Sequence, residues 1–214
     1  MELRSYVYLD RLQPQLAALM AKTAVGDIPV EGMASLWIEV IPGVEINRVA
    51  DIALKQTEVR PATQIEEREF GILEFHSYSQ EEVRNSGQKV LDHYGITLKD
   101  VMVPKIMTSQ IITGINPYHA QVLNRDRYGN MILPGESLFI LEVQPAVNSV
   151  LAANAAEKTI GSIRLVDFRA RGVYGRLYMS GTEAQAKAAE SAAVAAIESH
   201  AAALRGGSSD RKKK

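Results

Sequence analysis

An internal repeat constrains the fold of this sequence more than any other feature. The segment SLWIEVIPGVEINRVADIALKQT at residues 35–57 aligns with SLFILEVQPAVNSVLAANAAEKT at residues 137–159. Identical residues lie 103 positions apart in the two segments: Pro42 and Pro145, Ala53 and Ala156, and Lys55 and Lys158. Because self-similarity of this length is typical of duplicated structural units, the sequence predicts two tandem copies of one domain.

The alignment continues on both sides of this segment. Upstream, LQPQLAALMAKTAVG from Leu12 matches INPYHAQVLNRDRYG from Ile115, and downstream Gly71 aligns with Gly175 after a drift of one residue. The tail RGGSSDRKKK has no apolar residue to bury, which favours disorder. We therefore expect a first domain at residues 1–100, a second domain at residues 101–204 and a disordered tail at residues 205–214.

Each copy combines strand and helix patterns. RSYVYLD and SLWIEV are rich in the β-branched and aromatic residues that favour strands. In VEINRVADIALKQT the apolar residues recur with the spacing of one buried helix face: Ile46, Val49, Ala50, Ala53 and Leu54. Strands are expected at residues 59–66 and 70–77. We therefore predict an α/β or α+β fold of two tandem domains, each an antiparallel sheet with helices.

A second helix is expected in each copy. In the first copy it spans about residues 80–94, because Ser79 is a good N-cap residue and two glutamates follow it. Its counterpart at residues 183–204 is rich in alanine, the residue with the highest helix propensity. Trp37 and Phe139 are expected at equivalent core positions of the two copies.

Composition and charge exclude several classes of protein. Twenty-four basic and 25 acidic residues leave a net charge of −1, which indicates neither a nucleic-acid nor a membrane partner. Cysteine is absent, so disulfides, thiolate catalysis and cysteine-ligated zinc are excluded. No apolar run approaches the roughly 20 residues of a membrane helix, and MELR does not resemble a secretion signal. We expect a cytoplasmic protein.

No pattern of catalytic or metal-binding residues is present. The four histidines, at positions 76, 93, 119 and 200, lie far apart without a short metal-binding spacing. The sequence has neither a nucleophile elbow nor a phosphate-binding glycine loop. We therefore predict that the protein is not an enzyme and has no catalytic residues, metal site or cofactor. A soluble trimeric regulatory protein that binds a small molecule at a subunit interface remains the alternative to a structural role.

A block of four charged residues, Glu66 to Glu69, lies between two strands in QIEEREFG. Taken alone, it is typical of a polar hairpin tip with a surface ion pair worth under about 1 kcal/mol. However, ELRSYVYLD, SLWIEVIPGVEINRVADIALK, QIEEREFG and PGESLFILEVQPA together resemble the shell proteins of bacterial microcompartments. Within that family they resemble the tandem-domain, circularly permuted trimers of carboxysome and metabolosome shells, which stack face to face. The resemblance covers residues 2–204.

This resemblance implies a structural role in the shell of a cytoplasmic microcompartment. The expected particle is a pseudohexameric homotrimer, stacked as a dimer of trimers, that meets other shell proteins edge to edge. Lys55 and Lys158 match the lysine that lies at the tile edge in the family. Asn154 replaces Asp51 in the second copy, so the two edges are not expected to be equivalent.

The resemblance also places the charged block at a central pore, where Glu67 and Arg68 match the gating pair of the family. Three arginines about 6 Å apart would repel by about 3 kcal/mol per pair at an effective dielectric constant near 20. Glu67 of one chain can relieve this repulsion by pairing with Arg68 of the next.

The second copy has Arg171 and Gly172 at the positions of this gating pair, and Arg169 two residues earlier. We expect no nearby acidic residue in the sequence to pair with these arginines. Unpaired positive charges at a pore favour small anionic metabolites.

Overall fold

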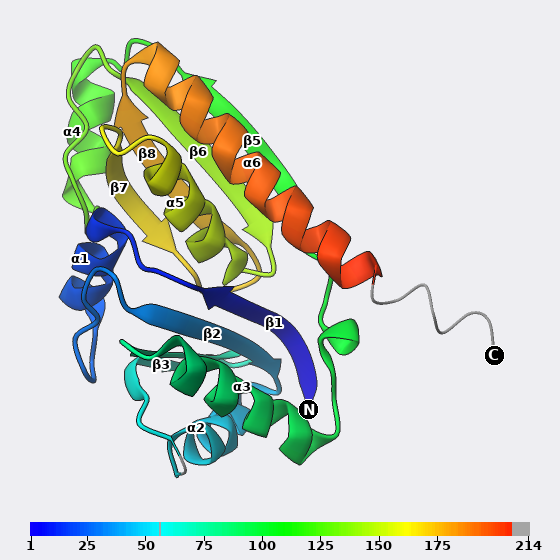
Figure 1. Cartoon of the computed structure of the whole chain (residues 1–214). Helices are drawn as coiled ribbons and strands as arrows, with labels where there is room; N and C mark the ends of the chain where they lie inside the picture. The colour runs from blue at the N-terminus through cyan, green and yellow to red at the C-terminus, as the bar shows by residue number, and fades with distance from the viewer. Residues whose placement is uncertain (56, 207–214) are drawn as a thin grey trace.

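The computed structural model describes residues 1–55 and 57–206, and these residues form two four-stranded antiparallel sheets (Figure 1). The first sheet has the order β1-β2-β4-β3, and the second has the order β5-β6-β8-β7. Their strands are β1 (Glu2–Leu9), β2 (Ala34–Ile41), β3 (Arg60–Glu66), β4 (Gly71–Ser77), β5 (Lys105–Ile112), β6 (Ser137–Gln144), β7 (Arg164–Arg169) and β8 (Gly175–Gly181). The identical strand order confirms the duplicated α+β fold.

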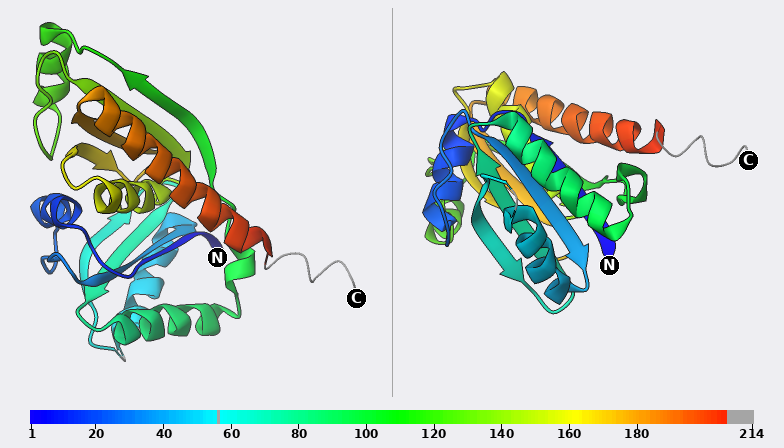
Figure 2. Two further views of the ribbon diagram at one scale, coloured as in Figure 1. Left: turned by 45° about the horizontal axis from the view of Figure 1, so that its top comes forward. Right: turned by 60° about the horizontal axis from the view of Figure 1, so that its bottom comes forward.

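Helices cover one face of each sheet (Figure 2). In the first repeat, α2 (Ile46–Lys55) and α3 (Gln80–Tyr94) pack on the sheet, and in the second, α5 (Asn148–Thr159) and α6 (Glu183–Gly206) do so. Two shorter helices, α1 (Pro14–Thr23) and α4 (Pro117–Arg125), follow the first strand of each repeat. Short 3-10 turns span Gly43–Glu45 and Leu98–Asp100.

The helix predictions hold for the elements with clear patterns. Ser79 caps α3, since its side chain accepts a hydrogen bond from the backbone N–H of Glu82 at 3.2 Å. The predicted face of α2 is buried except for Leu54, which is partly exposed. α6 ends at Gly206, so it includes the first two residues of the predicted tail. The rest of that tail, residues 207–214, lies outside the described residues.

Strand register corrects one prediction. Trp37 and Phe139 are both buried, as expected of core residues, but they do not occupy equivalent positions. Leu36 and Phe139 are each the third residue of their strands, and Trp37 corresponds to Ile140. The second copy has one additional residue before its proline, and a slip of one residue moves a side chain to the opposite face of a sheet. Trp37 therefore lies on the face that meets the second repeat, with its ring 6.2 Å from that of Phe168.

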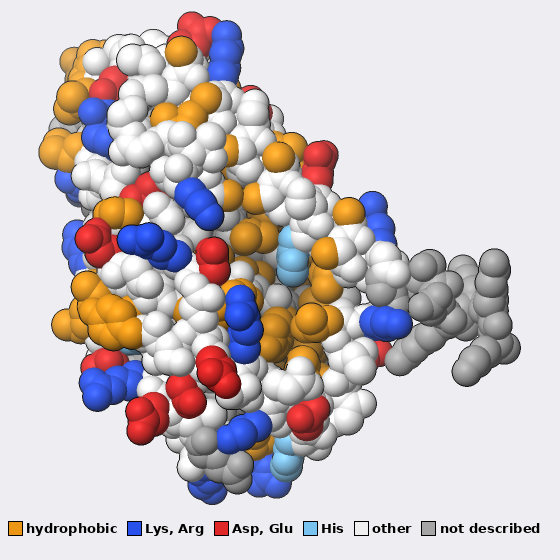
Figure 3. Space-filling view, in the orientation of Figure 1, with side chains coloured by type: hydrophobic (Ala, Val, Ile, Leu, Met, Phe, Trp, Pro, Cys, Tyr) orange, Lys and Arg blue, Asp and Glu red, His pale blue; other side chains and the backbone are white. Residues whose placement is uncertain are grey.

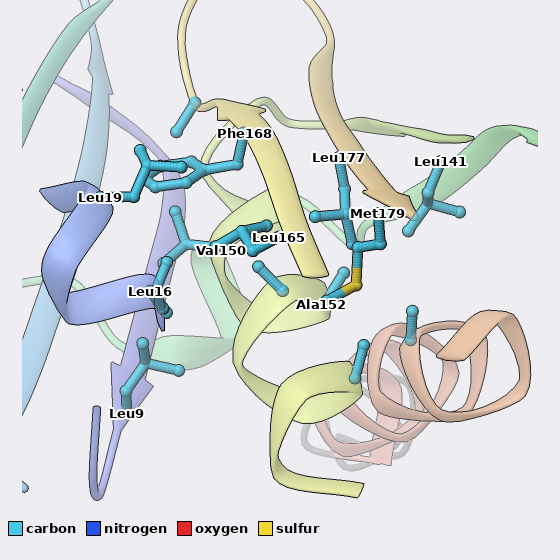
Figure 4. Packing of buried hydrophobic residues seen from close by; sticks show 14 of the residues in the cluster. Leu9, Leu16, Leu19, Leu141, Val150, Ala152, Leu165, Phe168, Leu177 and Met179 are labelled. Atoms are coloured by element: carbon cyan, nitrogen blue, oxygen red, sulfur yellow. The ribbon is translucent and has the colours of Figure 1, made fainter. Parts of the chain in front are cut away.

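The two repeats share a hydrophobic core at the place where α1 rests on the second repeat. Figure 4 shows Leu16 and Leu19 of α1 facing Val150, Leu165 and Phe168 of the second repeat. All five side chains are at most 8% exposed. Burial of apolar side chains on this scale contributes about 1.5–3 kcal/mol per residue, so this contact holds the two repeats in a fixed arrangement.

Polar contacts fix the N-terminus of α1 on α5. The carboxylate of Glu157 accepts hydrogen bonds from the backbone N–H groups of Gln15 at 2.6 Å and Leu16 at 2.9 Å. Asn154 accepts a hydrogen bond from the backbone of Gln13 at 3.0 Å. These groups satisfy amides that the first turn of a helix leaves without intrahelical partners, and a negative charge there is favourable. Contacts between residues about 141 positions apart thus position the two domains.

Candidate functional site

The predicted pore residues lie on two neighbouring loops. The loop of residues 67–70, called the gate loop after the predicted role of Glu67 and Arg68, joins β3 to β4. The second loop, residues 170–174, joins β7 to β8. A carboxylate oxygen of Glu67 accepts a hydrogen bond from the backbone N–H of Gly172 at 2.9 Å. Gly172 has φ +77°, a conformation that favours glycine. The structure thus brings two of the predicted residues into direct contact.

The gate loop has a fixed base and an exposed tip. The backbone N–H of Glu67 donates a hydrogen bond to the carbonyl of Phe70 at 2.8 Å, and the Phe70 side chain is 6% exposed. A Cβ atom at Gly43 would lie 2.6 Å and 2.7 Å from the carbonyl oxygens of these two residues, so only glycine permits this close approach. Arg68 and Glu69, at the tip, are exposed.

The exposed arginines of both loops form no ion pair within the described chain. Neither Arg68 nor Arg171 makes a salt bridge with any of the described residues. Glu66 accepts a hydrogen bond from Asn47 at 2.8 Å. Arg68 and Arg171 therefore remain available to charges that are not part of this chain.

Arg169 differs from these arginines, and the prediction that no acid would pair with it is wrong. Its guanidinium lies 2.6 Å from Asp126 and 3.0 Å from Asp167. Asp167 is two residues earlier on β7, and residues two apart point to the same face of a strand. The hydrogen bond from Arg169 and its charge lower the pKa of Asp126. Of the two arginines, Arg171 is the one without a salt bridge to a described residue, although its charge also contributes to the lower pKa of Asp126.

Two buried charges missed by the sequence analysis lie beneath the gate loop. Arg4 of β1 and Glu39 of β2 form an ion pair with 3.1 Å between Nη1 and Oε1. The second oxygen of Glu39 accepts a hydrogen bond from the backbone N–H of Val147 at 3.2 Å. The Arg4 guanidinium also stacks on the Phe70 ring, 4.0 Å from its centre. An acidic residue within the apolar run SLWIEV was the available signal.

The predicted edge lysines are both exposed, but their surroundings differ. Lys55 pairs with Asp51 at 2.8 Å along α2. Asn154, which replaces Asp51 in the second repeat, is 5% exposed and bonds to the backbone of Gln13 and Arg11. The asymmetry inferred from this replacement is therefore a feature of the contact between repeats.

A cavity of about 330 Å³ lies between the repeats beside the two loops. Its lining includes Trp37, Lys22 and Tyr128, together with Arg169 and Arg171 near the second loop. The Lys22 ammonium donates a hydrogen bond to the carbonyl of Tyr128 at 2.9 Å, so it bridges the two repeats across this cavity.

The most buried histidine lies beside two carboxylates. His76, 1% exposed, lies 3.3 Å from Glu74 and 3.5 Å from Asp27. Burial lowers its pKa, but the hydrogen bonds and charges of the two carboxylates outweigh burial and raise it. Within residues 1–55 and 57–206, no group of three or more potential metal ligands comes together, and no helix is long and apolar enough to cross a membrane.

The chain is similar to known proteins along almost its whole length. Residues 3–100 match the family model of the CsoS1D N-terminal domain. The chain is 50% identical to the carboxysome shell protein CcmP of Synechococcus elongatus, over 92% of each chain. It is 47% identical to the carboxysome shell protein CsoS1D of Hydrogenovibrio crunogenus, over 92% of this chain and 96% of that protein.

Solved structures give the same result. The fused permuted hexameric shell protein MSM0275 from the RMM microcompartment superposes with a TM-score of 0.91 at 43% identity, over 94% of this chain and 98% of that one. The double ringed trimeric shell protein MSM0271 from the same microcompartment superposes with a TM-score of 0.89 at 38% identity, over 92% and 96% of the two chains.

Proposed function

The chain belongs to the family of tandem-domain shell proteins of bacterial microcompartments, and we propose that it is a structural shell protein that forms a gated, pseudohexameric trimer. Its relatives include carboxysome shell proteins and a double ringed trimeric shell protein. We place it in the shell of a microcompartment in the cytoplasm, with residues 1–100 and 101–204 as its two domains. It meets other shell proteins at its edges and performs no chemistry of its own.

The trimer is inferred from an exposed apolar surface in the second repeat, whose counterpart in the first repeat is buried. Leu19 of α1 is 4% exposed because it packs against the second repeat. Its counterpart on α4, five residues after the first proline in both helices, is Val122, which is 66% exposed. Tyr118 on the same helix is 80% exposed. Figure 3 shows hydrophobic side chains gathered over α4, at the upper left. The apolar face of α4 thus corresponds to the apolar face of α1, but no domain of the same chain covers it.

A second copy of the chain supplies that partner. If α4 docks on the first domain of the next chain as α1 docks on the second domain of its own, Val122 becomes buried. In this arrangement Asp51 takes the place of Asn154, so its carboxylate faces the N-terminus of α4 at Asn116. A negative charge at a helix N-terminus is favourable. Head-to-tail contacts form a ring when the rotation between copies closes, and a ring of six domains corresponds to three chains.

The gate lies where the two loops of each chain meet the axis of this ring. Three copies bring Glu67, Arg68 and Arg171 together around one opening. Glu67 can pair with Arg68 of another chain to close the opening, and outward movement of the loops exposes the same charges to water. Arg171, which makes no salt bridge with a described residue, gives the opening a positive lining that favours small anionic metabolites.

Sheet assembly tests the shell function. Purified protein should form extended two-dimensional layers in electron micrographs at low salt. Lys55→Ala and Lys158→Ala should weaken the layers but leave the mass of the particle unchanged. Lys99→Ala, an exposed lysine of the 3-10 turn after α3, is the matched control. A particle that stays discrete under all conditions would favour the soluble regulatory trimer instead.

A further inference from the structure

The ion pair between Arg4 and Glu39 is buried and incompletely hydrogen bonded. The two side chains are 4% and 0% exposed. Arg4 Nη1 and Glu39 Oε1 lie 3.1 Å apart, yet neither atom has a hydrogen-bond partner among the described residues. The attraction within a buried pair repays its desolvation only when the remaining polar atoms are well bonded. The charge on Glu39 is therefore maintained at a high cost in free energy.

This pair contacts the gate loop directly. Arg4 stacks on Phe70, the residue that anchors the base of the loop. The negative charge of Glu67, at the other end of the loop, raises the pKa of Glu39. From the other elements around Glu39, β4 presents the apolar Ile72 as the register partner. The turn before α5 presents only the backbone N–H of Val147. Arg4, which is in contact, and Glu67 are thus the charged groups that act on Glu39.

The second repeat lacks this arrangement, although its fold is the same. The positions of Arg4, Glu39 and Phe70 are taken there by Met107, Glu142 and Tyr174. Met107 and Tyr174 are 45% and 38% exposed. Glu142 is 26% exposed and pairs with Arg176 at 2.8 Å. Of the two repeats as the structure describes them, the first alone has this buried pair, beneath the loop that contains Glu67 and Arg68.

We propose that Arg4 and Glu39 are positioning residues of the gate loop and that a proton on Glu39 favours the loop conformation described above, whereas its loss favours a displaced loop. The functional meaning of this switch rests on the proposed role of the loop as a gate. A neutral Glu39 removes the repulsion between its own charge and that of Glu67. An ionised Glu39 instead favours movements that take Glu67 away and admit water.

The direction of the pH effect follows from linkage. Burial raises the pKa of Glu39 from 4.5 to about 7, although Arg4 and the Val147 hydrogen bond lower it, and the Glu67 charge raises it further. A displaced loop hydrates Glu39 and moves Glu67 away, so Glu39 has a lower pKa in that state. The state with the lower pKa is favoured as the pH rises. The displaced loop should therefore become more populated from about pH 4.5 up to about pH 7 and level off above this.

Hydrogen exchange of the full chain tests the proposal. The amides of Glu67 and Gly172, which are both hydrogen bonded in this conformation, should be followed by mass spectrometry between pH 5.5 and 8, with correction for intrinsic exchange. The opening equilibrium of the loop should rise by up to about tenfold per pH unit and then level off near pH 7. Glu39→Gln should abolish this rise, and Glu39→Asp should restore a rise. Glu142→Gln, the matched substitution in the second repeat, should keep the wild-type profile.

Arg4→Met, which introduces the residue of the second repeat, provides an independent variant. Because the charge of Arg4 lowers the pKa of Glu39, its removal should shift the transition to higher pH. An unchanged pH profile in Glu39→Gln or Arg4→Met would overturn the proposal. Loss of the pH-dependent rise in Glu142→Gln would also overturn it. Mass and layer formation, measured on the same samples, report separately on the shell function.

Discussion

The carboxylate of Glu67 accepts a hydrogen bond from the backbone N–H of Gly172 at 2.9 Å, which links the loops of two domains 105 residues apart. The acidic member of the predicted gating pair is therefore held by the neighbouring domain of its own chain. Arg68 is exposed and makes no salt bridge with the residues that the structure describes. In the proposed gate, closing would depend on how Glu67 divides its hydrogen bonds between Gly172 and an arginine from another chain.

Loss of the Glu67 carboxylate should loosen the second loop. A hydrogen bond to a charged group contributes about 1.5–3 kcal/mol, so Glu67→Ala should increase exchange of the Gly172 amide by about tenfold or more. Hydrogen exchange with mass spectrometry measures this change. Glu66→Ala is the matched control, because Glu66 bonds to Asn47 rather than to the second loop. An equal increase in both variants would contradict the assigned contact.

The two arginines of the second loop region should behave differently. Arg171→Ala should weaken binding or passage of phosphorylated metabolites and leave the free energy of unfolding within about 0.5 kcal/mol of wild type. Arg169→Ala should lower that free energy, since it leaves the buried carboxylate of Asp167 without its cation. Equilibrium binding of a phosphorylated three-carbon acid and denaturant titration separate the two effects. Unchanged anion binding in Arg171→Ala would contradict the positive lining.

Glu157 should be a major determinant of the contact between domains. It is 4% exposed and accepts two backbone hydrogen bonds from the start of α1. Glu157→Gln replaces one acceptor with an amide donor, so it should lower the free energy of unfolding by about 2–3 kcal/mol. Denaturant titration measures the loss. Glu198→Gln, at an exposed position of α6, should change it by less than about 0.5 kcal/mol.

Val122 should separate trimer formation from folding. Val122→Glu places a charge on the exposed face of α4, so the chain should fold with near-normal stability but fail to assemble. Analytical ultracentrifugation together with circular dichroism tests this expectation. Val25→Glu, at an 81% exposed position after α1, is the matched control and should assemble normally. Full assembly of the Val122 variant would show that α4 does not meet another chain.

The sequence predicted the elements whose signals are local. Apolar spacing predicted α2, and the cap at Ser79 predicted the start of α3. The repeat then predicted that both halves share one topology. The start signals of α1 and α4 were also present but were not used: a proline occupies the first turn of each helix, and Asn116 caps α4 by accepting a hydrogen bond from the backbone N–H of Tyr118.

Contacts between distant residues could not be predicted in this way. Periodicity indicates that Glu39 and Glu157 lie on elements with buried faces, but it does not identify their partners. Arg4 is 35 residues before Glu39, and Leu16 is 141 residues before Glu157. The pairing of Arg169 with Asp167 could nevertheless have been predicted from the sequence, because alternate residues of a strand share a face. The additional residue before Pro145 is visible in the sequence, but strand register was needed to show that it displaces Phe139 relative to Trp37.

The absolute mass of the purified protein in solution tests the central claim most directly. Each chain has a mass of 23.5 kDa, so native mass spectrometry should give a particle of three chains or, for two stacked rings, six. Either result places Glu67, Arg68 and Arg171 around a common axis. A monomer or dimer under all conditions of salt and concentration would leave these residues without an axis and would contradict the gated shell trimer.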